Sequence, residues 1–191
     1  NEIADSYDHN PNADFHQLVA DMAKIPRSQA KVINLGLFYG MGKAKLEAEL
    51  GVSKDKAKEL FDIYHSKVPF VKQLTNKLMT AAQRNGKIKT ILNRKCRFPK
   101  YEPVLKGNDW GKYIPPQDHE RMLELQAMGP HMKDEEGEFI VDKDGNKQKN
   151  YWHENDSRRA FTYKALNKLI QGSAADMTKK AMLELYKEGI T

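Results

Sequence analysis

Helical periodicity is the feature of this sequence that most restricts its fold. Apolar residues recur every three or four positions through most of the first 85 residues and again over 157–187, which is typical of amphipathic helices. Glycines and prolines stand between the periodic runs, where they begin or end helices. The pattern predicts helices over 13–24, 26–39, 43–50, 69–85 and 157–187, with Asp14 as an N-cap of the first. It also predicts a helix that Ser53 caps and that ends before Pro69.

Short β elements interrupt this helical pattern at two places. Residues 87–92 alternate between polar and apolar side chains as a strand does, and Asn93 and Arg94 follow as a turn. Further along, 138–141 and 148–152 flank the turn-forming residues 143–146, which predicts a hairpin. The predicted fold class is therefore mostly α with a minor β component, an α+β arrangement.

Composition excludes several classes of protein. The 191 residues carry 32 Lys and Arg against 26 Asp and Glu, a net charge of +6, and 39% are hydrophobic. Such a chain can bury a core, and its mild basicity suits a polyanionic partner. A single cysteine excludes an internal disulfide framework and a cysteine-rich zinc site. We expect no membrane span and no signal segment, because no apolar run approaches about 20 residues.

A basic and aromatic stripe marks the predicted helix 26–39. Arg27, Lys31, Leu35 and Tyr39 are spaced by four residues, so their side chains drift by only about 40° per step around the helix. Two cations near a helix N-terminus suit a polyphosphate, and the apolar end of the stripe suits a sugar and a base. Gly36 would leave bare backbone for a flat base to approach. Spacing alone is explained at least as well by an ordinary amphipathic helix with an incidental glycine.

The same stretch resembles motif B of family A DNA polymerases, Arg-x3-Lys-x3-(Phe or Tyr)-Gly-x2-Tyr-Gly, with Leu35 in the aromatic position. The resemblance implies a fingers helix that binds the incoming dNTP. Lys31 would contact the triphosphate, Arg27 its outer phosphates, Leu35 the deoxyribose, and Tyr39 the templating base. Lys31 is also the implied catalytic residue, as the proton donor to the leaving pyrophosphate. His16, in an Asp-x-His pattern upstream, would add a further phosphate contact.

Two further segments resemble the DNA-binding parts of this family. Residues 167–176 resemble its Asn-x3-Gln-Gly-(Thr or Ser)-Ala-Ala-Asp palm helix, in which Asn167 and Gln171 would donate to minor-groove acceptors. Tyr163 stands where many members have arginine. Residues 86–99 resemble the family's Thr-x-x-Gly-Arg-Arg segment, so that Arg94 and Arg97 would contact primer-template phosphates.

The resemblance implies a domain organisation and a reaction. Residues 1–99 are expected to form a fingers subdomain, 100–156 a lineage-specific insertion, and 157–191 a long palm helix. The implied reaction is templated nucleotidyl transfer in DNA replication, assisted by Mg²⁺ ions. The chain is expected to be a piece of a larger polymerase that acts in the cytoplasm, of a host cell if the protein is viral. The metal-binding carboxylates are expected in the rest of that polymerase, and no metal-ligating residue is assigned here.

A second class of function remains open at this point. A helical nucleic-acid-binding or accessory module without catalysis, derived from a polymerase, would have the same basic charge, helices and hairpin. Such a module would bind nucleic acid without depending on dNTP.

Overall fold

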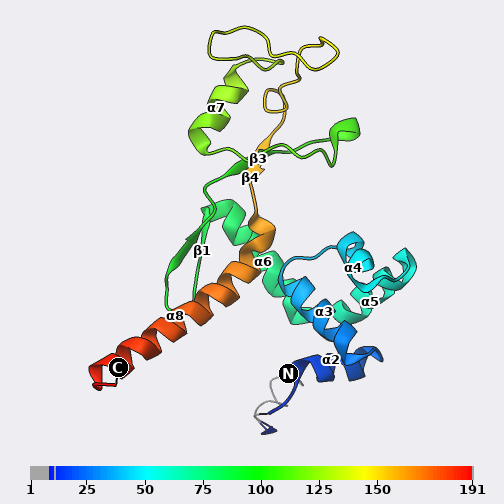
Figure 1. Cartoon of the computed structure of the whole chain (residues 1–191), viewed down its shortest axis with the longest axis vertical. Coiled ribbons are helices and arrows are strands. Elements are labelled where there is room, and N and C mark those ends of the chain that lie inside the picture. The colour runs from blue at the N-terminus through cyan, green and yellow to red at the C-terminus, as the bar shows by residue number, and fades with distance from the viewer. Residues whose placement is uncertain (1–8, 11, 191) are drawn as a thin grey trace. The chain divides into compact units, whose positions relative to one another are not determined.

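The structure, a computed structural model, describes residues 9–10 and 12–190, and the chain divides into two compact units (Figure 1). The first unit holds the described residues up to Met79, Thr90–Leu92, and the chain from Tyr163 onward. The second unit holds Thr80–Lys89 and Asn93–Thr162. Each unit is described by itself below.

Helices make up the first unit, and their ends follow the local chemistry of the sequence. They are α2 (Phe15–Ala23), α3 (Arg27–Phe38), α4 (Lys43–Leu50), α5 (Lys54–Lys67), the first part of α6 (Pro69–Asn85), and α8 (Ala165–Lys187). The predicted caps are confirmed, since the Asp14 carboxylate accepts from the His16 and Gln17 N–H groups and the Ser53 hydroxyl from the Lys56 N–H.

One apolar core joins these helices. The side chains that are almost fully buried in it come from every helix of the unit: Val19, Ala20, Ala30, Ile33, Leu37, Leu46, Leu60, Tyr64, Val68, Val71 and Leu166. Removing a side chain of this size from water contributes about 1.5–3 kcal/mol. Because Ile33 and Leu37 turn α3 toward this core, the opposite side of the same helix, with Lys31 and Leu35, is left outside.

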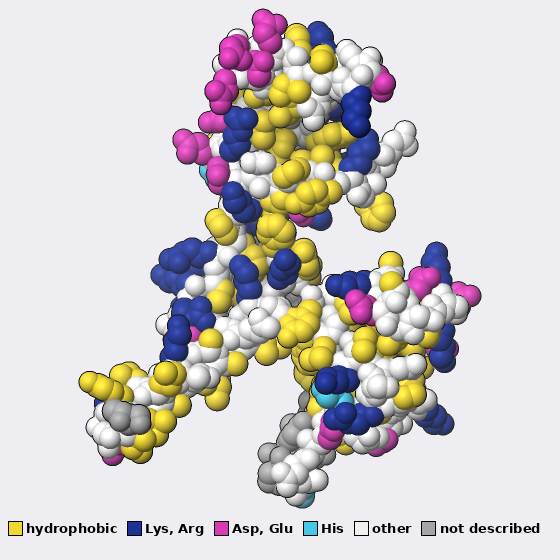
Figure 2. Space-filling model, viewed as in Figure 1, with side chains coloured by type: hydrophobic (Ala, Val, Ile, Leu, Met, Phe, Trp, Pro, Cys, Tyr) yellow, Lys and Arg dark blue, Asp and Glu magenta, His cyan; other side chains and the backbone are white. Residues whose placement is uncertain are grey.

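The prediction of one continuous helix over 157–187 is wrong at its start. Residues 157–159 form a strand, Phe161 adopts a left-handed backbone with φ +61°, and α8 begins only at Ala165. The apolar periodicity of 157–187 also predicts a buried helix side, which is wrong beyond the first turn of α8. Ala165 and Leu166 are buried, whereas Ile170, Met177 and Leu185 are exposed. Figure 2 shows hydrophobic side chains on the surface along α8.

The strand predicted over 87–92 is shorter than expected. β1 (Lys87–Lys89) pairs antiparallel with β2 (Lys95–Arg97), and the chain then leaves the ladder. The reason lies in the next residues: the Thr90 hydroxyl bonds the buried Asp176 carboxylate, and the Ile91 N–H donates to Ser173 Oγ at 3.0 Å. Both partners belong to α8, so Thr90 and Ile91 bond to that helix instead of extending the strand. Asn93 turns the chain with φ +67°, as predicted.

The second unit contains a helix that the sequence did not reveal. α7 (His119–Ala127) is capped by Asp118, and its Met122 and Leu125 bury against Trp152. β3 (Tyr101–Pro103) pairs antiparallel with β4 (Ser157–Arg159). This pairing brings together the two ends of the segment 104–156. The 310 helices η1 (Gly107–Asp109) and η2 (Thr162–Lys164) complete the described elements.

The hairpin predicted around 143–146 is confirmed in its turn and only partly in its strands. The Asp142 carboxylate accepts from the N–H groups of Asp144 and Asn146, and isolated bridges join Val141 to Lys147 and Lys133 to Phe139. Residues 138–141 thus lie between two neighbouring segments without forming a regular strand.

None of the described helices is long and apolar enough to cross a membrane.

Candidate functional site

The outer side of α3 carries the predicted stripe. Lys31 is exposed, Leu35 is 41% exposed, and Tyr39, directly after the helix, is 47% exposed. The four-residue spacing places Arg27, Lys31 and Leu35 on successive turns about 6 Å apart. The fold therefore presents a cationic start and an apolar end of one helix face to the surroundings.

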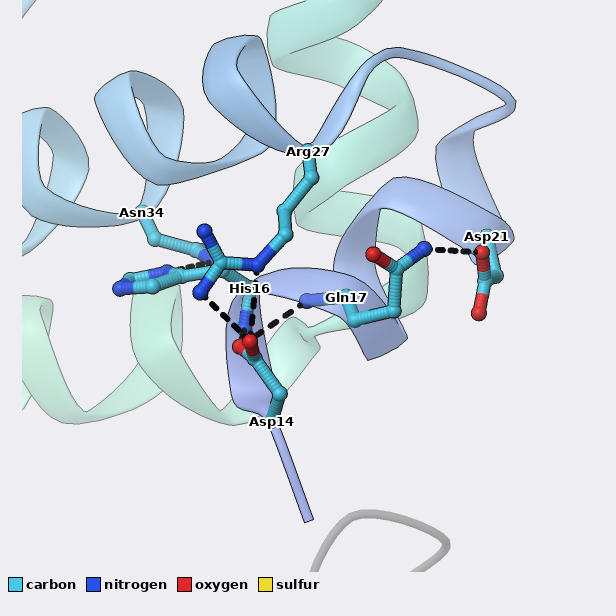
Figure 3. A network of polar contacts seen from close by, with 6 residues as sticks. All are labelled: Asp14, His16, Gln17, Asp21, Arg27 and Asn34. Carbon is cyan, nitrogen blue, oxygen red and sulfur yellow. Dashed lines mark hydrogen bonds and ion pairs between the residues drawn. The ribbon is translucent and has the colours of Figure 1, made fainter.

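Arg27 is held by Asp14, the residue that also caps α2 (Figure 3). The Arg27 guanidinium donates to Asp14 Oδ2 through Nε at 2.8 Å and Nη2 at 2.5 Å. The other carboxylate oxygen accepts from the His16 N–H at 2.8 Å and the Gln17 N–H at 3.2 Å. The Arg27 hydrogen bonds are the main reason that the pKa of Asp14 lies below its usual value. One exposed carboxylate thus orients both the start of α2 and the first cation of the stripe.

His16 is paired with Asn34 across the interface of α2 and α3. Asn34 Nδ2 lies 2.9 Å from His16 Nδ1, and Asn34 is fully buried within the core side of α3. Figure 3 shows the second ring nitrogen of His16 pointing away from Asn34. The described structure gives the buried Asn34 Oδ1 no hydrogen-bond partner.

The far end of the stripe meets α8. Gln171 Nε2 donates to the Tyr39 hydroxyl at 3.2 Å, and Asn167 lies one helical turn earlier, half-buried. The chain turns sharply between α3 and α4, where Gly40 has φ +77° and packs on the backbone carbonyl of Tyr163. Two predicted residues from distant parts of the sequence, Tyr39 and Gln171, are therefore in direct contact.

An open groove of about 450 Å³ runs beside this end of α3. The prediction that Gly36 leaves bare backbone for a base is wrong in this structure, because the Met41 side chain packs there. A Cβ atom added at Gly36 would lie 2.2 Å from Met41 Cε. Residues that line the groove are Val32, Leu35, Gly36, Tyr39, Gly40, Met41, Gly42, Lys45, Glu49 and Tyr163.

The predicted DNA contacts Arg94 and Arg97 lie on the β1–β2 hairpin of the second unit, where both are exposed. The register sets Lys87 opposite Arg97 and Lys89 opposite Lys95. Like charges directly opposite each other destabilise a strand pair. This register places four cationic side chains on a single hairpin.

Two exposed carboxylates of the described chain have structural roles. Asp118 caps α7, Asp142 closes a turn, and the lowered pKa of each reflects first the backbone N–H groups that these carboxylates accept from. Within the described residues, no three or more His, Cys, Asp or Glu side chains come together as a group that could hold a metal ion.

Sequence reasoning missed two members of the site. Asp14 was recognised as a cap and as the first residue of the Asp-x-His pattern, but not as the partner that holds Arg27. Asn34 was not singled out, yet a signal was present: it is a polar residue on the same helix face as the buried Ala30 and Leu37. A buried polar side chain among core positions calls for a partner.

Comparison with known proteins defines the family. A family model described as DNA polymerase family A matches residues 3–190. The chain is 30% identical over 223 residues to a DNA-directed DNA polymerase of Pseudomonas phage M6, covering 99% of this chain and 26% of that protein. It is also 26% identical to DNA polymerase I of Geobacillus stearothermophilus over 90% of this chain and 14% of that protein.

A solved structure shares the fold. The POL domain of Pol1 from M. smegmatis, in complex with DNA primer-template and dNTP, matches with a TM-score of 0.57 and 22% identity, over 94% of this chain and 25% of that one. The chain thus spans about a quarter or less of the length of these relatives. It belongs to DNA polymerase family A.

Proposed function

We propose that this chain supplies the nucleotide-binding fingers helix and part of the primer-template surface of a DNA-directed DNA polymerase. The observation that carries the proposal is the exposed face of α3, on which Arg27, Lys31, Leu35 and Tyr39 follow one another from the helix start to its end. The spacing matches motif B, and the family match includes all of α3.

In this proposal the triphosphate of the incoming dNTP binds the cationic half of the face. Lys31 and Arg27 contact its phosphates, with a further hydrogen bond from His16. Leu35 then lies toward the sugar and Tyr39 toward the base pair. The primer 3′-hydroxyl attacks the α-phosphate and gives up its proton to solvent, the bond from the α-phosphate to pyrophosphate breaks, and Lys31 donates a proton to that leaving group. Where negative charge develops during a reaction, a charged donor stabilises the transition state more than it stabilises the bound substrate.

DNA is proposed to contact both units. Asn167 and Gln171 of α8 are amide donors of the kind that can bind the acceptors shared by all base pairs in the minor groove. Arg94 and Arg97 would contact phosphates, which makes that part of the binding independent of sequence. The solved relative, whose complex contains DNA primer-template and dNTP, supports these two classes of partner.

The domain assignment follows the same proposal. Residues 1–99 are assigned to the fingers, 157–191 to a palm helix, and 100–156 to a lineage-specific insertion within the segment that the family model matches. The phage relatives support replication in the cytoplasm of a host cell as the setting.

Divalent metal ions, expected to be Mg²⁺, would assist the transfer. The described residues contain no cluster of three ligating side chains, so none of them is assigned to a metal. The roles proposed above for this chain's residues, phosphate binding and proton donation, do not depend on which carboxylates hold the ions.

The test is the variant Lys31→Ala in the complete polymerase. Single-turnover incorporation should fall by about 10²–10³, the loss typical when one donor to a developing anion is removed. The control is Lys58→Ala, which removes an exposed cation from α5 of the same unit. Incorporation by Lys31→Ala at the rate of the control would refute the proposal. Binding of DNA without any response to dNTP would favour the accessory module.

A further inference from the structure

We propose that Asn34 is a positioning residue for nucleotide binding: it fixes the His16 ring so that a protonated Nε2 faces the triphosphate. The inference rests on the proposed function and adds to it a residue that touches neither phosphate nor base.

The geometry of the pair is specific. Asn34 Nδ2 and His16 Nδ1 are 2.9 Å apart, a normal hydrogen-bond distance. Asn34 is fully buried, so its amide cannot turn out to water, whereas His16 is half-buried. Figure 3 shows the imidazole held at Nδ1 by Asn34 with Nε2 directed away from it.

Packing does not explain an amide at this position. Asn34 lies on the same side of α3 as the buried Ala30 and Leu37, where an apolar side chain would satisfy the core. Instead the amide is buried with Oδ1 unpartnered among the described residues. A buried polar atom without a hydrogen bond is a cost to folding, so a role beyond packing accounts better for the amide.

The amide determines which ring nitrogen carries the proton. When Nδ2 donates to Nδ1, the neutral ring must hold its proton on Nε2. If the amide turns over, Oδ1 accepts from Nδ1–H, and Nε2 then carries a proton only when the ring is cationic, the form that a bound triphosphate favours. The nitrogen that faces away from the core is thus a donor in the first arrangement, and in the second once the ring is cationic, as a phosphate oxygen requires.

The fixed ring also lowers the cost of binding. A histidine that rotates freely must be ordered when the nucleotide binds, whereas the buried amide has already ordered this one. His16 also follows the capped start of α2, where the Asp14 carboxylate holds its backbone N–H at 2.8 Å. Side chain and backbone of His16 are therefore both fixed before any ligand arrives.

The experiment uses the complete polymerase with primer-template and measures single-turnover incorporation against dNTP concentration. Asn34→Leu keeps the approximate size of the side chain and removes its hydrogen bond. Asn34→Ala also removes the hydrogen bond but adds no bulk, so it shows whether overpacking by leucine causes the effect. Both should weaken the apparent affinity for dNTP roughly 5- to 20-fold, as expected for one hydrogen bond to a charged group, with a smaller change in the maximal rate. The matched control is Ile33→Val, which trims a buried neighbour on α3.

A double-mutant cycle separates positioning from folding. In the background of His16→Ala, Asn34→Leu and Asn34→Ala should cause no further loss of dNTP affinity, since the residue acts through the ring. An equal loss with and without His16, or a similar loss in Ile33→Val, would overturn the inference. If the Asn34 variants leave dNTP affinity unchanged while Lys31→Ala abolishes incorporation, the inference fails and the proposed function stands. If Lys31→Ala is also without effect, the proposed function fails.

Discussion

At the scale of the residue, one carboxylate links the two helices of the proposed nucleotide site. Asp14 caps α2 and accepts two hydrogen bonds from Arg27, and these bonds lower the pKa of its carboxyl group from an ordinary value of 3.8. The exposed pair adds little to stability by itself. The pair holds Arg27 against α2, so under the proposed function phosphates would compete with Asp14 for the same guanidinium.

The lowered pKa of Asp14 makes a prediction about stability in acid. A group whose pKa falls on folding stabilises the fold above its unfolded pKa and loses that contribution as the pH drops through the folded value. Asp14→Asn should therefore be slightly less stable than the unmodified chain at pH 6, and the difference should begin to shrink near pH 3.8 and vanish below the lowered pKa of the folded state. Urea unfolding across this range measures it, and Arg27→Gln should behave in the same way. Two stability curves that stay parallel down to acid pH would contradict the account.

Single residues were predictable from the sequence where spacing fixes a helix face. Lys31, Leu35 and Tyr39 are all exposed, as the four-residue spacing indicated. The contact of Asn34 with His16 and that of Arg27 with Asp14 were not predictable in the same way, because each joins α2 to α3. Periodicity within a helix says which side is buried but not which neighbour covers it.

At the scale of the element, the turn between α3 and α4 gives a matched pair of glycines. Gly40 has φ +77°, and a Cβ there would lie 3.0 Å from the Tyr163 carbonyl oxygen. Gly42, two residues later, has φ −87° and open space around it. Gly40→Ala should lower the free energy of unfolding by about 1–2 kcal/mol, the cost of a left-handed conformation. Gly42→Ala should lower it by less, because it only replaces the N-cap residue of α4. Thermal unfolding of the two variants measures this; equal stabilities would refute the strained turn.

The elements were predicted well where local chemistry sets their ends and poorly where tertiary contacts do. The boundaries of α2 to α6 follow from caps, prolines and glycines. β1 ends early because Thr90 and Ile91 bond to α8, and no local signal announces partners more than 80 residues away. α8 starts late for a similar reason: residues 157–159 pair with β3 instead of continuing the helical pattern.

At the scale of the whole molecule, the β1–β2 hairpin should make DNA binding sensitive to salt. Each phosphate contact releases counterions, so the logarithm of the binding constant falls with the logarithm of salt concentration. Arg94→Ala and Arg97→Ala should each reduce that slope by about 1, with no change in sequence preference. Lys143→Ala, in the turn near Asp142, is the control and should leave the slope unchanged. Unaltered slopes for both arginine variants would show that the hairpin does not contact DNA phosphates.

The central claim is that the outer face of α3 binds the triphosphate of the incoming nucleotide, and a chemical footprint tests it most directly. The complete polymerase is bound to a primer that ends in a dideoxynucleotide, so that no incorporation occurs. It is treated with an amine-acylating reagent, with and without the matched dNTP, and modification of Lys31 and Lys58 is measured by mass spectrometry. Both side chains are exposed in the absence of ligand. The account predicts that matched dNTP protects Lys31 and leaves Lys58 reactive. Equal acylation of Lys31 with and without nucleotide would contradict it.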